Sequence, residues 1–88
     1  MTVTPLPTTP YALRQRLFQI RAEYLQLDRL YDLENIPTAR REILERGAAG
    51  NELPVETFTP LLKAHVKALL EARMAYIETL LEELNLRS

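Results

Sequence analysis

Cysteine is absent from this sequence, and histidine occurs once, at position 65. The absence of cysteine excludes a disulfide framework and thiolate chemistry. With one histidine, the chain also lacks the four nitrogen or sulfur ligands that common structural zinc sites require. We therefore expect no metal or other cofactor, and a core this small is most simply reinforced by association with another chain.

An excess of one charge and a long apolar run are also missing. Eleven basic and 12 acidic residues give a net charge of -1, whereas a dedicated nucleic-acid binder usually has a clear basic excess. No uncharged apolar run approaches the roughly 18 residues of a membrane span. The first ten residues, MTVTPLPTTP, have neither the basic nor the apolar region of a secretion signal. These features predict a soluble cytoplasmic protein that does not bind membranes.

Glycine is scarce, with two residues, and neither strand-like alternation nor a hairpin dipeptide occurs. With 88 residues, 47% of them hydrophobic, the chain is long enough for one small domain. We predict an all-α fold, with residues 1–10 as an extended proline-rich tail and residues 11–88 as a single helical domain.

The first predicted helix covers residues 11–34, with Thr9 as its N-cap and Pro10 at its first position. Its apolar residues are spaced 4-3-4-3-4, which is typical of a coiled-coil seam. The seam residues are Leu13, Leu17, Ile20, Tyr24, Leu27 and Tyr31. Pro37 is expected to prevent the helix from continuing further.

Two more helices are predicted, over residues 38–46 and 60–85. Gly47 is the expected residue after the end of the short helix, and the pair Thr59 and Pro60 repeats the cap signature found at the first helix. The two long helices then have matched lengths, and the segment between them permits an antiparallel return. The predicted architecture is two long antiparallel helices with a short connecting helix, forming a helical bundle as a dimer.

Both long helices carry more apolar surface than one hairpin hides. Phe18 and Leu25 lie seven residues apart outside the seam with Ala22 between them, so they are either covered by the short helix or left for another chain. The last helix carries a ridge of Ala64, Ala68, Ala72 and Ala75. Alanine is either a packing surface there or simply a good helix former. A homodimer forming a four-helix bundle is the simplest closed arrangement for this surplus surface.

Few residues suggest chemistry. His65 has no nucleophile or orienting carboxylate at a recognisable spacing, so a structural role is expected. Arg73 either lies at the edge of the apolar stripe or pairs with Glu23 or Asp28. Small helical dimers with arginine-bearing helices include the helical chorismate mutases, but here the arginines of the first helix flank the seam. The similarity is one of structural class, and it identifies no family.

The leading hypothesis is a non-enzymatic protein–protein interaction module: an adaptor, a regulator or an assembly factor. Its predicted partner-binding residues are Phe18, Ala22, Leu25, Arg40, Arg41, Ala68 and Ala72. One alternative is a nucleic-acid-binding regulator that uses the short helix with Arg40, Arg41 and Arg46, although Glu42 and Glu45 lie between these arginines. A second alternative is a small dimeric enzyme with a site between its subunits.

Overall fold

A computed structural model describes residues 9–87 of the chain, which form four helices and no strand. The helices are α1 (Pro10–Leu25), α2 (Leu27–Leu30), α3 (Thr38–Gly50) and α4 (Val55–Arg87). The prediction of an all-α fold is confirmed for these residues. The predicted tail at residues 1–10 lies outside the described residues except for its last two positions.

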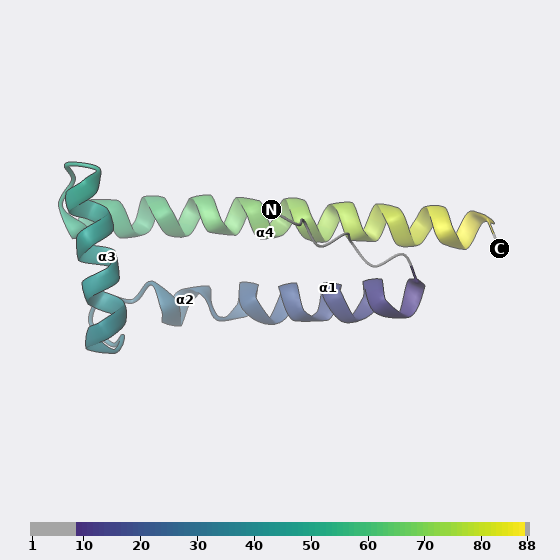
Figure 1. Cartoon of the computed structure of the whole chain (residues 1–88), viewed down its shortest axis with the longest axis horizontal. Helices are drawn as coiled ribbons and strands as arrows, with labels where there is room; N and C mark the ends of the chain where they lie inside the picture. Colours follow the sequence, from purple (N-terminus) through teal and green to yellow (C-terminus); the bar gives the residue numbers. More distant parts are fainter. Residues whose placement is uncertain (1–8, 88) are drawn as a thin grey trace, which may run out of the picture.

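Helices α1 and α4 run side by side in opposite directions, and α3 lies across one end of the pair (Figure 1). The antiparallel direction is also evident from two contacts between the helices: Arg21 binds Glu78, and Tyr24 binds Glu71. The molecule measures 51 × 29 × 19 Å. Of the other described helices, α2 continues along the line of α1, and α3 lies across the end of the pair rather than on either face (Figure 1). The α1–α4 hairpin is therefore a single layer, and no other described helix covers its two faces.

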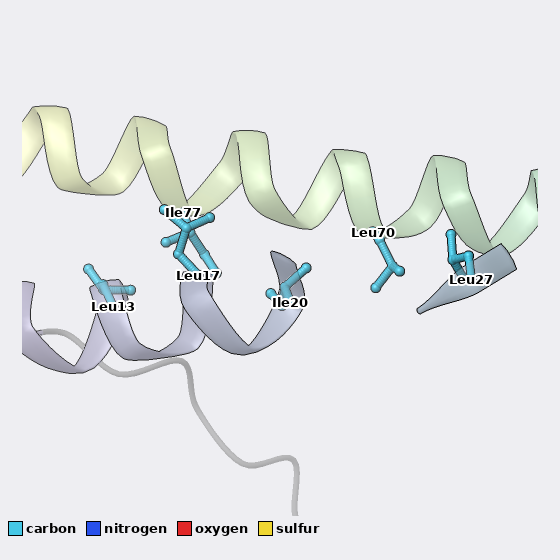
Figure 2. Packing of buried hydrophobic residues seen from close by; sticks show 6 residues of the cluster. All are labelled: Leu13, Leu17, Ile20, Leu27, Leu70 and Ile77. Atoms are coloured by element: carbon cyan, nitrogen blue, oxygen red, sulfur yellow. The ribbon is translucent and has the colours of Figure 1, made fainter. Parts of the chain in front are cut away.

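The core lies between α1, α2 and α4, and Figure 2 shows its side chains pointing from one helix toward the other. Its buried members are Leu13, Leu17, Ile20, Leu27, Leu70 and Ile77. The partly buried Tyr24 and Tyr31 pack against this cluster. All six predicted seam residues thus belong to the core, so the 4-3 spacing correctly identified the face of the first helix that is buried.

The predicted start of the first helix is confirmed, but its predicted extent over residues 11–34 is wrong. Thr9 accepts a hydrogen bond from the Ala12 amide through its side chain, 3.3 Å away, and Pro10 is the first helical residue. The helix is interrupted at Gln26, whose amide donates to the Glu23 carbonyl. In a straight α-helix, residues spaced by seven move slowly around the helix axis. The tighter turn at Gln26 adds rotation that offsets this movement, so Leu27 stays buried against α4.

The segment after α2 leaves the helix because Asp32 binds the backbone that follows it. Its carboxylate accepts from the Glu34 amide at 3.1 Å and from the Asn35 side chain at 2.8 Å. These bonds offer the backbone an alternative to helical pairing. The side-chain bond from Asn35, followed by the bond from the Glu34 amide, lowers the pKa of Asp32.

Helix α3 continues to Gly50, so the prediction that Gly47 follows its end is wrong. Gly47 lies within the helix, where a Cβ atom would come within 2.9 Å of Cε1 of Phe58 on α4. The absence of a side chain therefore lets the Phe58 ring approach α3 closely. Leu44 and Ala48 of α3 are buried, and so is Thr59 of α4. These contacts place α3 across the start of α4.

The actual end of α3 is a Schellman motif built around Glu52. The Leu53 amide donates to the Ala48 carbonyl at 3.0 Å, and the Glu52 amide donates to the Ala49 carbonyl at 3.1 Å. Glu52 has a φ of 56°, in the left-handed region that glycine adopts more easily. A glutamate at this position therefore carries conformational strain that a glycine would not.

Replacing Glu52 with glycine is expected to raise the free energy of unfolding by about 1 kcal/mol, since the left-handed conformation costs an L-residue roughly this much. Urea denaturation followed by circular dichroism measures the change. Glu52→Ala is the matched control, because it removes the same carboxylate but keeps a Cβ atom. If both variants were stabilised equally, the gain would come from loss of the carboxylate charge and not from relief of the left-handed backbone conformation at residue 52.

Helix α4 begins at Val55, not at Pro60, so the predicted helix over residues 60–85 is too short at its start. The Pro54 carbonyl accepts from the Phe58 amide at 2.9 Å and thereby opens the helix five residues earlier. Thr59 is therefore not an N-cap but a buried residue, and its hydroxyl has no hydrogen-bond partner among the described residues. The two long helices are not matched in length either, with 16 residues in α1 and 33 in α4.

Candidate functional site

The most exposed apolar side chains lie on the side of α1 that faces away from α4. Phe18 and Leu25 are 73% and 80% exposed, and Tyr11, seven residues before Phe18, is 70% exposed. Neither α3 nor any other described helix covers them, so of the two possibilities left open by the sequence, exposure is the correct one. We refer to Tyr11, Phe18, Ala22 and Leu25 as the outer row. Tyr11 was not predicted, although its heptad spacing from Phe18 and Leu25 was available as a signal.

The alanine ridge of α4 is exposed as well. Ala68 and Ala72 each lie two positions from the buried Leu70, or about 200° around the helix. Phe18 and Ala22 have the same relation to the buried Ile20 on α1. The outer row and the alanine ridge therefore lie on opposite edges of the hairpin layer, and the structure does not bring these two groups together.

The arginines of α3 are largely engaged within the chain. Arg40 donates to the Leu30 carbonyl at 3.3 Å, and its guanidinium lies 5.1 Å from the centre of the Tyr31 ring. Arg41 donates to the Leu33 carbonyl at 2.8 Å and to the Glu45 carboxylate at 2.9 Å. These contacts connect α3 to the segment that precedes it. They also occupy donors that would otherwise be available for binding a phosphate.

One face of the hairpin is closed by polar contacts between its two helices; we call it the cross-linked face. Arg21 and Glu78 form an ion pair at 3.2 Å, and the Tyr24 hydroxyl donates to Glu71 at 3.1 Å. Lys63 binds Asp28. The hydrogen bond from Lys63, together with its positive charge, lowers the pKa of Asp28. Most of the charged groups on this face are thus satisfied by the chain itself.

The opposite face, which we call the open face, carries Arg16 of α1 and Arg73 and Tyr76 of α4. Residues seven positions away lie on the same side of each helix, which adds Glu23 of α1 and Leu69 and Leu80 of α4 to this face. A shallow pocket of about 240 Å³ between the helices is lined by Arg16, Ile20, Arg73, Tyr76 and Ile77. Leu69 and Tyr76 are 48% and 54% exposed. Within the described part of the chain, no ion pair involves Arg16, Glu23 or Arg73.

Arg73 thus lies at the edge of the apolar stripe, exposed, and Asp28 is not its partner because Asp28 binds Lys63. Sequence reasoning considered Arg73 alone and missed Arg16 across the pocket on α1 and Tyr76 beside it on α4. The spacing of Arg73 from Tyr76 was visible in the sequence. Its proximity to Arg16 depends on how the two helices are aligned, which the sequence does not show.

His65 is exposed on α4. In the described range, no three histidine, aspartate or glutamate side chains are grouped as metal ligands. Nor does any helix of that range have the length and apolar character needed to cross a membrane. No protein-family model, curated protein or solved structure matches the chain.

Proposed function

We propose that the chain is a non-enzymatic protein–protein interaction module, acting as an adaptor, regulator or assembly factor that binds another protein through the outer row of α1. The observation that carries this proposal is the exposure of Tyr11, Phe18 and Leu25, each at least 70% exposed and spaced by seven residues. A single exposed apolar residue has little meaning, but an aligned row of them is typical of a binding surface.

The spacing of the outer row favours a helical partner. Side chains at positions seven apart lie along one side of a helix, about 10 Å from one another. Ala22 leaves a small-residue gap between Phe18 and Leu25 into which a partner side chain fits, as knobs fit into holes in helix pairs. Aromatic residues at the centre of such a surface often contribute a large part of the binding energy.

Truncating Phe18 to alanine is expected to reduce binding of the partner by about tenfold or more, as for a central aromatic anchor. Helix content and stability should change little, because exposed positions usually contribute within about 0.5 kcal/mol. Immobilised wild-type and variant chains would be compared for the proteins that they retain from an extract of the source cells. Circular dichroism of both chains provides the folding check.

The matched control is Leu61→Ala, which also shortens an exposed apolar side chain but lies on α4, away from the outer row. It should retain the partner as well as the wild type does. Equal retention by the Phe18 variant would contradict the proposal. A large loss of helix signal in that variant would instead assign Phe18 to the core.

Nucleic-acid binding through α3 is less well supported. The guanidinium groups of Arg40 and Arg41 already donate to the Leu30 and Leu33 carbonyls. Arg46 donates to the Glu42 carbonyl within α3 at 3.4 Å. A phosphate would have to compete with these contacts and with the nearby carboxylates, which repel it.

A further inference from the structure

We propose that the open face binds a second copy of this chain about a two-fold axis, with α4 antiparallel to α4 and α1 antiparallel to α1, to form a four-helix bundle. This surface is separate from the outer row, which remains exposed in such a dimer. The two proposals can therefore fail independently of each other.

The row on α4 is self-complementary in its spacing. Leu69, Arg73, Tyr76 and Leu80 are spaced 4-3-4, which is symmetric about the point between residues 74 and 75. An antiparallel copy centred there places Leu69 opposite Leu80 of the second copy. It also places Arg73 opposite Tyr76 of the second copy, where a guanidinium on an aromatic ring is favourable. An isologous interface requires this kind of pairing, because each contact occurs twice.

The charges on α1 are symmetric about the same level of the hairpin. Arg16 and Glu23 lie seven residues apart, hence on one side of α1, and their midpoint lies between residues 19 and 20. The three contacts between the helices, Arg21–Glu78, Tyr24–Glu71 and Asp28–Lys63, are centred on Tyr24 and Glu71, so in an antiparallel pair this midpoint is level with residues 75 and 76 of α4. The two midpoints agree to about one residue, or roughly 1.5 Å. A single two-fold axis therefore pairs Arg16 of each copy with Glu23 of the other copy.

The cross-linked face offers no comparable arrangement, since Arg21, Asp28 and Lys63 already have partners of opposite charge in their own chain. On the open face, Arg16 and Arg73 line one pocket without a carboxylate among its lining residues. The missing negative charge comes from Glu23 of the second copy. Stacking of two hairpins also turns a single layer of helices into the two layers that stable domains usually have.

Light scattering coupled to size-exclusion chromatography, over a range of concentrations, is expected to give twice the chain mass of 10.2 kDa for the wild type. Arg16→Glu and Glu23→Arg should each raise the dimer dissociation constant about tenfold or more, because like charges then face each other twice per dimer. Mixing these two variants should restore the dimer, since each then supplies the charge that the other needs. Arg14→Glu, exposed on the same helix, is the control that changes net charge equally and should leave the dimer intact.

Recovery of the dimer in the mixture tests for a contact between two chains. A defect confined to the fold of one variant would not be repaired by adding the other variant. Circular dichroism of each variant confirms that the helices are retained. A wild type that stays monomeric at all concentrations would overturn the proposal. A dimer that tolerates both charge reversals, or that is not restored by mixing, would overturn it as well. Dissociation by Phe18→Ala in place of the charge reversals would assign self-association to the outer row.

Discussion

Replacing Ile77 with alanine is expected to lower the free energy of unfolding by about 2–5 kcal/mol, as truncation of a buried isoleucine usually does. Ile77 is 1% exposed and belongs to the cluster that joins α4 to Leu13, Leu17 and Ile20 of α1 (Figure 2). The change removes apolar contact area and leaves a cavity between two helices whose faces no other described helix covers (Figure 1). Because native domains are stable by only about 5–15 kcal/mol, this loss is a large fraction of the total.

Urea denaturation at a fixed protein concentration measures this loss, since self-association makes stability depend on concentration. Leu61→Ala is the matched control: it also shortens an apolar side chain on α4, but Leu61 is 58% exposed. The control is expected to change stability by no more than about 0.5 kcal/mol. Similar losses in the two variants would contradict the packing of α4 on α1 through Ile77.

The second large effect is a gain. Pro60→Ala is expected to raise the free energy of unfolding by about 2 kcal/mol. Proline in a helix interior is roughly 3 kcal/mol less favourable than alanine. Part of this gain is offset, because alanine makes the unfolded chain more flexible than proline does. Pro60 lies inside α4. It cannot donate to the Glu56 carbonyl four residues earlier, and its ring crowds that carbonyl. It also disfavours the helical conformation of Thr59, which precedes it.

Thermal and urea denaturation of the Pro60 variant measure the gain. The control is Pro54→Ala, because Pro54 precedes the helix and contributes its carbonyl, which accepts from the Thr57 and Phe58 amides. Alanine keeps that carbonyl, so this variant should lose about 0.4–1 kcal/mol through the more flexible unfolded chain. A loss of stability in the Pro60 variant would show that α4 begins at Pro60, as the sequence had suggested.

The helical class and the buried side of the first helix were both predictable from local chemistry. Residues spaced 4-3 along α1 share one side of the helix whatever the rest of the chain does, and Leu13, Leu17 and Ile20 accordingly form the core. The N-cap at Thr9 was also predictable, since its side-chain bond reaches only three residues along the chain. The same periodicity placed Phe18 and Leu25 outside the seam, but their exposure was decided by the position of α3, which lies across the end of the hairpin and does not cover them (Figure 1).

The helix ends were not predictable in this way, because they depend on contacts between distant segments. Gly47 has the residue type of a helix terminator, yet its role is to admit the Phe58 ring of α4. The helix ends instead at Gly50, in a motif whose left-handed residue is Glu52, a residue type that rarely adopts a positive φ. Pro60 resembles a helix start, yet α4 extends through it, with the adjacent Thr59 buried.

The difference between the two hairpin faces likewise depends on tertiary structure. Periodicity assigns a residue to one side of its own helix, but it does not align that helix with its neighbour. Only the alignment of α1 with α4 brings Arg21 to Glu78 on one face and Arg16 to the pocket lined by Arg73 on the other. The spacing of apolar residues thus sufficed for the core, since burial acts on a whole row of side chains. Pairing of charges acts between individual atoms over a few ångströms, and it therefore required the folded chain.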